Sequence, residues 1–240
     1  MTRKSVSSAV LVAGIVLILA VWCAGCTTPV PQSPAAAPAV KQVSHYMDAL
    51  PYAGEVFPGP PVNVVVDTDT RMVSGSSMSV KNNGVEYGVG PATVDESGVT
   101  LRQMFSPDAP DGTYTVTYTT CLETGGCEQG TYQFSINRSL ASSYTDLRGQ
   151  SAVVINIVNG EKDPRYVIVS PGTTVTWTNM DTVNHTADSD THMTHSNYPE
   201  MDSGDLTPGD TFTLVLDKPG VYPNHCSDHP ETEHAIVIVQ

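Results

Sequence analysis

Short segments that alternate β-branched or aromatic residues with polar ones recur along most of this chain. The clearest are residues 113–119 (TYTVTYT) and residues 173–178 (TTVTWT). A period of two is typical of a β-strand with one buried face, and no stretch of residues 45–137 keeps a helical period over ten residues. Turn-forming residues such as Asn83-Gly84 separate the segments. The sequence therefore predicts an all-β protein built of β-sandwiches.

Composition divides the chain into two predicted domains and their flanking segments. Residues 45–137 and 151–240 are globular in composition, and each contains several short strand-like segments. Residues 138–150 are polar and without pattern, which predicts a linker between two consecutive sandwiches. Residues 27–44 are rich in Pro and Ala, as is typical of an extended spacer.

Residues 1–26 have the features of an export signal. Arg3 and Lys4 precede the apolar run of residues 9–22, and Ala-Gly-Cys26 follows it. A charged start, an apolar stretch and small residues before a cleavage point define such signals. The ending resembles the lipobox of exported lipoproteins, which implies lipidation of Cys26; an uncleaved transmembrane anchor is the alternative. We expect the folded part to lie outside the cytoplasm, tethered to a membrane.

Acidic residues outnumber basic ones along the chain. The 25 Asp and Glu against 11 Lys and Arg give a formal charge of −14. Nucleic acid is therefore not an expected partner, because phosphate binding requires a surface rich in Lys and Arg. Residues 151–240 contain 13 Asp and Glu against 3 Lys and Arg. We expect a partner protein of this domain to present a basic surface.

The cysteines beyond the N-terminal segment differ in their expected roles. Cys121 and Cys127 are close in sequence, and an exported protein permits disulfides, so we expect a disulfide closing a short loop. A Cu(I)-binding dithiol is the alternative. Cys226 has no such neighbour. An unpaired cysteine in an exported protein needs an explanation, and a metal ion is the first to consider.

Cys226 lies in a pattern that suits a soft metal ion. His229 follows it in a C-x2-H motif after a predicted strand, and His185 lies just past another predicted strand. One thiolate and two imidazoles form the trigonal ligand set of electron-transfer copper sites. A zinc site, a Cys-His pair of a cysteine protease and a chance arrangement stay open on spacing alone.

The motifs around these residues follow the order and spacing of a known family. Residues 153–240 contain PGTTVTWTNMDTVNHT, DSGDLTPGDTFTLVLDKPGVY and HCSDHP. This part of the chain resembles the plastocyanin and amicyanin family of cupredoxins, which are Greek-key sandwiches. The resemblance implies one copper ion, cycling between Cu(I) and Cu(II), on three equatorial ligands: His185, Cys226 and His229. It also implies that Asn179 and Ser227 form hydrogen bonds around those ligands.

The weak axial methionine of that family has no counterpart here, since no Met follows Met201. His234 stands at the plastocyanin-like spacing and is our first choice as the axial ligand. Glu233 is our second choice, because it would supply a hard oxygen donor, as Glu231 could also do. An open axial site near Thr232 is the third. A hard or strong axial ligand favours Cu(II) and lowers the reduction potential.

His225 and one loop contain further potential metal ligands. Neighbours along a strand face opposite sides, so His225 should point away from a metal held by Cys226. Residues 188–201 (DSDTHMTHSNYPEM) are rich in His, Met and carboxylates, and we expect an ordinary polar loop. The alternative is a second, labile copper site of four loop side chains: His192, Met193, His195 and Met201.

Residues 45–136 resemble CopC-type copper-binding domains, which are Ig-like sandwiches. The matching features are His45, ALPYAGEVFPGPPVNVVVDTD and APDGTYTVTYTTCLETGGCEQGTYQFSI. That family binds Cu(II) through an N-terminal His and a late loop that contains Asp and His. The late loop here, between Cys121 and Cys127, has no His, and His45 is internal. The resemblance therefore implies the fold and leaves copper binding at His45 open.

These features predict a membrane-tethered, extracytoplasmic copper protein that carries one electron to or from a redox partner protein. We expect no enzymatic activity, because a single mononuclear site lacks the additional centre that copper oxidases use. The rival hypothesis is a copper carrier or storage protein that uses the same site together with the His/Met-rich loop. A weaker alternative is an adhesive sandwich protein with a degenerate metal site.

Overall fold

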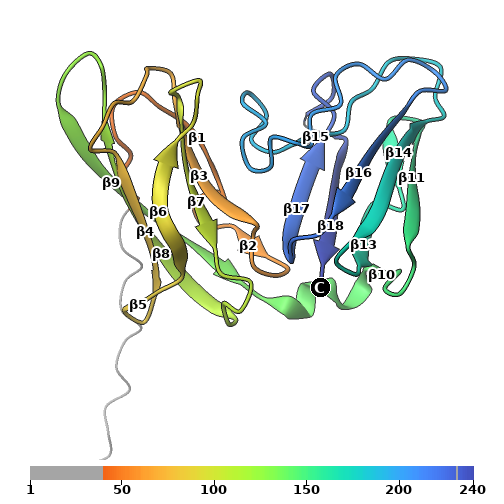
Figure 1. The fold of residues 1–240 in the computed structure, drawn as a ribbon, viewed down its shortest axis with the longest axis horizontal. Helices are drawn as coiled ribbons and strands as arrows, with labels where there is room; N and C mark the ends of the chain where they lie inside the picture. Colours follow the sequence, from red (N-terminus) through yellow and green to blue (C-terminus); the bar gives the residue numbers. More distant parts are fainter. Residues whose placement is uncertain (1–39, 231) are drawn as a thin grey trace, which may run out of the picture. The chain divides into compact units, whose positions relative to one another are not determined.

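The computed structural model describes residues 40–230 and 232–240, which belong to one compact unit. The predicted export segment with Cys26, and the predicted spacer up to residue 39, lie outside the described residues. Within the described part, no helix is long and apolar enough to cross a membrane. Its regular structure consists almost entirely of β-strands (Figure 1).

The first nine strands form two sheets around one core. One sheet has the order β1-β3-β7-β6 and the other the order β2-β9-β8-β4-β5. All neighbours are antiparallel except β2 and β9. The strands are β1 (Tyr46–Leu50), β2 (Val56–Phe57), β3 (Asn63–Thr68), β4 (Ser77–Asn82), β5 (Val85–Glu86), β6 (Gly88–Val94), β7 (Thr100–Phe105), β8 (Gly112–Cys121) and β9 (Cys127–Ile136).

Alternation along β8 builds the core of this first sandwich. Tyr114, Val116 and Tyr118 are buried, whereas the threonines between them are partly exposed. Phe134 of β9 stacks on Tyr114, with ring centroids 5.3 Å apart. The period-two pattern of the sequence is therefore the burial pattern of the strand.

The remaining strands form the two sheets of the second sandwich. One sheet has the order β10-β13-β18-β17-β15 and the other the order β12-β11-β14-β16. Three neighbouring pairs are parallel, namely β10 with β13, β13 with β18 and β11 with β14. The strands are β10 (Thr145–Asp146), β11 (Ala152–Val158), β12 (Glu161–Asp163), β13 (Tyr166–Val169), β14 (Thr173–Asn179), β15 (Asp188–Ser189), β16 (Thr211–Leu216), β17 (Gly220–His225) and β18 (His234–Val239).

Trp177 of β14 lies in the centre of the second core and is fully buried. It shares this core with Ile155 of β11, its partner in the parallel register, and with Val237 of β18. β17 ends at His225 and β18 begins at His234, and these two residues are directly paired. The loop between the two strands therefore emerges at one end of a packed sandwich, where the sheets hold it in place.

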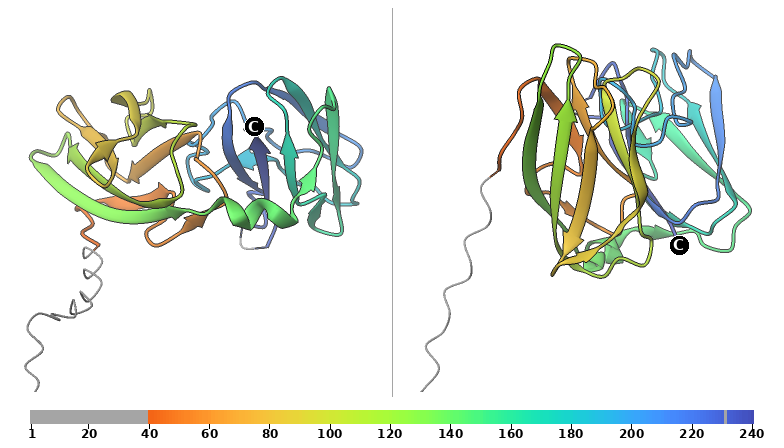
Figure 2. Two further views of the ribbon diagram at one scale, coloured as in Figure 1. Left: turned by 90° about the horizontal axis from the view of Figure 1, so that it is seen from below. Right: turned by 60° about the vertical axis from the view of Figure 1, so that its left-hand side comes forward.

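The segment predicted as an unpatterned linker contains regular structure. The 3-10 helix η1 (Arg138–Ser143) follows β9, and Asn137 caps it by accepting a hydrogen bond from the Ser139 amide at 3.1 Å. The short green coil in Figure 2 is η1, and β10, which follows it, pairs with β13. The predicted fold class, all-β with two consecutive sandwiches, is confirmed.

Asp67 of β3 connects the first sandwich to a loop of the second. Its side chain is buried and accepts hydrogen bonds from the hydroxyl of Thr191, from that of Thr194 at 2.7 Å and from that of Ser196 at 3.3 Å. A buried carboxylate is stable only where hydrogen bonds replace its hydration. The three hydroxyls supply them, so this carboxylate fixes the course of residues 191–196.

Candidate metal centre

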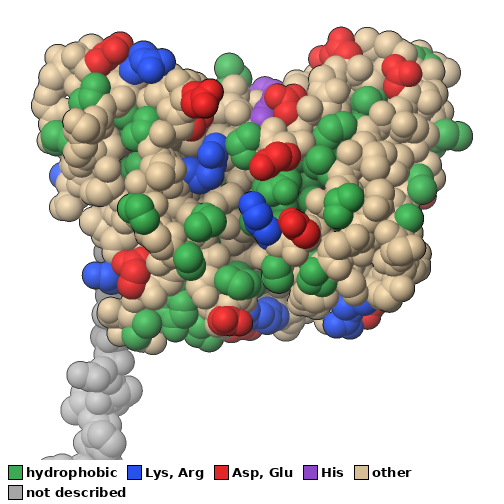
Figure 3. All heavy atoms as spheres, viewed as in Figure 1, with side chains coloured by type: hydrophobic (Ala, Val, Ile, Leu, Met, Phe, Trp, Pro, Cys, Tyr) green, Lys and Arg blue, Asp and Glu red, His purple; other side chains and the backbone are tan. Residues whose placement is uncertain are grey.

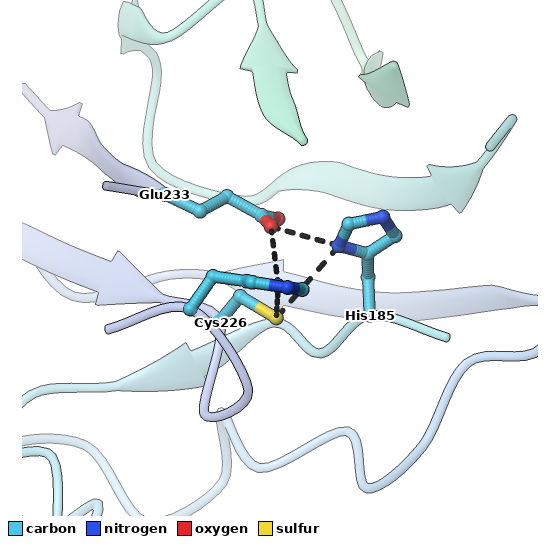
Figure 4. A group of neighbouring side chains, drawn as sticks. His185, Cys226 and Glu233 are labelled. Carbon is cyan, nitrogen blue, oxygen red and sulfur yellow. Dashed lines mark hydrogen bonds and ion pairs between the residues drawn. The ribbon is translucent and has the colours of Figure 1, made fainter. Parts of the chain in front are cut away.

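Four side chains with metal-binding atoms converge at the end of the second sandwich: His185, Cys226, His229 and Glu233. His185 lies in the loop after β14, Cys226 directly follows β17, and Glu233 directly precedes β18. Figure 4 shows the Cys226 sulfur and the Glu233 carboxylate both directed at one nitrogen of the His185 ring. The sequence-predicted equatorial residues are therefore brought together.

The loop that contains three of these residues is closed by its own backbone. The Cys226 amide donates to the Glu233 carbonyl at 3.1 Å, and the Glu233 amide donates to the His229 carbonyl at 3.1 Å. The His229 amide in turn donates to the Cys226 carbonyl at 3.0 Å. These three hydrogen bonds fold the C-x2-H segment back on itself, and they bring Glu233 beside Cys226.

The distances within the group match those of a trigonal metal site. Cys226 Sγ lies 3.8 Å from His185 Nδ1 and 3.7 Å from His229 Nδ1. An ion held at about 2.3 Å from sulfur and about 2.0 Å from nitrogen, with ligands 120° apart, separates S and N by about 3.7 Å. Both sulfur-to-nitrogen distances therefore match those of ligands on one ion.

The environment of the four residues is dry on all sides but one. His185, Cys226 and Glu233 are almost completely buried, whereas the His229 side chain is 47 % exposed. Burial raises the pKa of the Cys226 thiol, and the nearby Glu233 carboxylate adds to this shift. A free thiolate is thus disfavoured here, and a cation bound to it would remove the penalty.

Glu233 is the fourth potential ligand of the group. Its Oε2 lies 2.8 Å from His185 Nδ1 and 3.9 Å from His229 Nδ1, while its Oε1 has no hydrogen-bond partner. His234, our first choice from the sequence, is not in this group. It is the direct cross-strand partner of His225, and paired residues of two strands lie on the same face, so its ring lies 6.1 Å from that of His225.

Lys162 of β12 was not singled out by sequence reasoning. Its side chain is fully buried, with Nζ 3.5 Å from Glu233 Oε1 and 3.3 Å from the Glu233 carbonyl oxygen. Burial lowers the pKa of this ammonium, and the Glu233 charge opposes that shift. The one feature that could have indicated its burial is its middle position in the three-residue strand Glu161–Asp163, because alternation along a strand turns every second side chain inward.

Several hydrogen bonds hold the ligand loops together. Asn179 Nδ2 donates to the carbonyls of Val183 at 2.8 Å and Leu206 at 2.7 Å, which fixes the loop of His185. The Thr186 amide points at Cys226 Sγ, 3.3 Å away. The Ser227 amide donates to the Thr186 hydroxyl at 2.8 Å, and the Ser227 hydroxyl donates to the Asp188 carboxylate at 2.6 Å. Asn179 and Ser227 thus occupy the supporting positions that the sequence suggested.

The remaining candidates lie elsewhere. Cys121 and Cys127 are joined by a disulfide. His45 Nδ1 lies 2.7 Å from Asp69 Oδ1 and 3.0 Å from the Thr70 hydroxyl, and among the described residues no other His or Cys joins them in a group of potential ligands. A second group does exist, formed by Asp188, His195 and Asp202.

Comparisons with known proteins yield solved structures only; no family model and no curated protein matches the chain. A purple cupredoxin from Nitrosopumilus maritimus is 32% identical over 37% of this chain and 99% of its own, with a TM-score of 0.32. An amicyanin mutant in the Cu(I) form is 21% identical over 42% and 89%, with a TM-score of 0.34. CopC from Methylosinus trichosporium OB3b is 21% identical over 38% and 91%, with a TM-score of 0.35.

Proposed function

We propose that this protein is a copper-dependent one-electron carrier. His185 Nδ1, Cys226 Sγ and His229 Nδ1 would hold the ion, and a Glu233 oxygen would be the fourth candidate ligand. The observation that supports this best is the pair of sulfur-to-nitrogen distances, 3.8 and 3.7 Å, which fit ligands of a common ion. A copper ion held there supplies a one-electron Cu(II)/Cu(I) couple.

The protein's own residues suit that role in two ways. The ligand loop is closed by backbone hydrogen bonds and its buried ligands are packed, so little should move when the charge of the site changes. His229 is the exposed ligand, and its ring gives a partner protein a short path to the metal. We therefore place electron entry and exit at His229.

Charge balance also favours a site that can be reduced. The formal charges of Cys226, Glu233 and Lys162 sum to minus one, which neutralises Cu(I) and leaves one positive charge with Cu(II). A buried net charge is costly, so neutrality of the reduced state stabilises it. Lys162 thereby offsets the preference of a carboxylate for Cu(II).

We further propose that the protein works outside the cytoplasm, tethered through residues 1–26. The support is the charged start, the apolar run and the Ala-Gly-Cys26 ending of the sequence. Its redox partner would present a basic surface, because the second sandwich has a large excess of carboxylates.

Copper loading of the full chain tests the proposed function. Addition of Cu(II) should produce an intense visible thiolate-to-copper band that bleaches on reduction and returns on reoxidation. The variant Cys226→Ser should lose this band. If the colour persists without the thiol, the central proposal is wrong. If reduction releases the copper to a chelator and reoxidation does not restore the band, a copper carrier becomes the better description.

A further inference from the structure

His225 and Cys226 are consecutive, yet their side chains lie in different environments. His225 is fully buried, and its Nε2 lies 3.1 Å from Nδ1 of His192. Two imidazole nitrogens bound to one ion at about 2.0 Å, at angles between 90° and 109°, are about 2.8 to 3.3 Å apart. The two rings are therefore spaced as a pair of ligands on a common ion.

Asp190 fixes the orientation of the buried ring. Its Oδ1 lies 2.6 Å from His225 Nδ1. A carboxylate on one ring nitrogen keeps the proton there, so the lone pair of the other nitrogen faces outward. In His225 that nitrogen is Nε2, and it faces His192. Carboxylate–imidazole pairs of this kind are the usual support of metal-binding histidines.

The loop that contains His192 is held in a defined shape. Thr191, Thr194 and Ser196 bind Asp67 through their hydroxyls. His192 and His195 lie between them in sequence, and their ring centroids are 5.1 and 5.6 Å from that of His225. The three hydroxyl contacts therefore present both imidazoles to His225 before any ligand arrives.

Access and charge both favour a cation at this position. His192 is partly exposed, and Figure 3 shows histidine atoms at the surface beside carboxylates. Asp190 and Asp188 place carboxylate charge near the two rings, which favours a cation there. The methionines of the loop are not part of the cluster, since Met193 is 68% exposed and Met201 is packed in the second core.

We propose that His192 Nδ1 and His225 Nε2 form a second metal site, which binds a divalent transition-metal ion and prefers Cu(II). Among divalent first-row ions, Cu(II) binds imidazole nitrogen most tightly. The ion would replace the proton that lies between the two nitrogens, and that proton would move to Nε2 of His192, so that Nδ1 offers its lone pair and the ring stays neutral. Water would complete the coordination, and without a thiolate ligand this ion would give no thiolate-to-copper colour. The site is separate from the proposed electron carrier and extends the chain's metal chemistry beyond it.

Copper stoichiometry and electron paramagnetic resonance of the full chain test this site. After Cu(II) loading and desalting, two copper ions per chain are expected, one of them with a tetragonal signal and nitrogen hyperfine splitting. His192→Asn should remove this second ion and leave the thiolate band intact. His225→Asn should do the same, and the retained band shows that the variant is folded. Cys226→Ser should remove the band and leave the second ion, which separates this proposal from the proposed function.

Two matched controls sharpen the result. Met193→Asn changes the same loop without removing an imidazole, and it should retain both ions. His45→Asn removes an exposed histidine of the first sandwich, and it should also retain both. The proposal is overturned if the wild type binds one copper ion, if either His192→Asn or His225→Asn retains the second ion, or if His45→Asn loses it.

Discussion

The ammonium of Lys162 lies 3.5 Å from Oε1 of Glu233, and both side chains are completely buried. Such a pair is held inside a protein only while both partners are present, because either charge alone would be left without hydration. The pair also lies against the proposed copper ligands. Its two members can therefore be tested separately for their effects on stability and on redox behaviour.

Lys162→Met should destabilise the metal-free protein by about 3 to 5 kcal/mol, the usual cost of breaking a buried ion pair. Chemical denaturation followed by Trp177 fluorescence measures this. The double variant Lys162→Met with Glu233→Gln removes both charges and should recover most of the loss. Equal denaturation midpoints for the single variant and the wild type would contradict a structural role for the pair.

Glu233→Met should raise the reduction potential of the copper site. A thioether in place of a carboxylate removes a negative charge and a hard donor, both of which favour Cu(II). We expect a rise on the order of 100 mV, since about 59 mV corresponds to a tenfold change in relative affinity for a one-electron couple. Asp228→Asn, which changes an exposed carboxylate of the same turn, should shift the potential far less. Equal potentials for Glu233→Met and the wild type would argue against axial contact by Glu233.

Glu55 should make stability fall as the pH rises from about 4.5 to about 7. Burial raises the pKa of this carboxyl from 4.5 to about 7, so the folded state holds a proton that the unfolded chain has already released. The unfolded state then binds fewer protons, and the free energy of unfolding decreases with pH across this window. Glu55→Gln should flatten the profile, while the exposed Glu96→Gln should not. Parallel profiles for Glu55→Gln and the wild type would count against the shift.

The Cys121–Cys127 disulfide should stabilise the first sandwich and leave the copper site unaffected. Closing so short a loop contributes about 2 kcal/mol through the entropy of the unfolded chain. The double variant with Ser at both positions should lower the free energy of unfolding of the first sandwich by that amount, as measured by calorimetry. Its visible spectrum should stay unchanged. A changed copper band would show a coupling between the two sandwiches that this prediction does not include.

Local patterns were sufficient to predict the strands, whereas the three equatorial candidates were implied by the family resemblance. Alternation along segments such as Gly112–Cys121 reports directly which side chains face a core. The same rule placed His225 away from Cys226, and the structure agrees. The burial pattern of the strands and the direction of His225 both follow from the two-residue period of a strand, which can be seen in the sequence.

The place of Glu233 beside Cys226 and the burial of Lys162 depend on information that no local pattern contains. Glu233 turns toward Cys226 because three backbone hydrogen bonds close its loop, and such bonds are set by the paired strands on either side. His234 shares a face with His225 because the two are paired across β17 and β18, and that register is invisible in the sequence of either strand. The contact of Lys162 with Glu233 joins residues 71 positions apart, so it too follows from the assembled sheets.

Asp67 affects what is lost when the second sandwich is prepared as a separate fragment. Its carboxylate, in β3 of the first sandwich, accepts hydrogen bonds from Thr191, Thr194 and Ser196. Excision at residue 145 would keep every side chain of the Cys226 centre but would remove the anchor of the loop that holds His192. A fragment made this way should therefore look complete by its colour while lacking a working His192–His225 pair. The boundary between the two sandwiches therefore separates the His192–His225 pair from a residue that holds it in place.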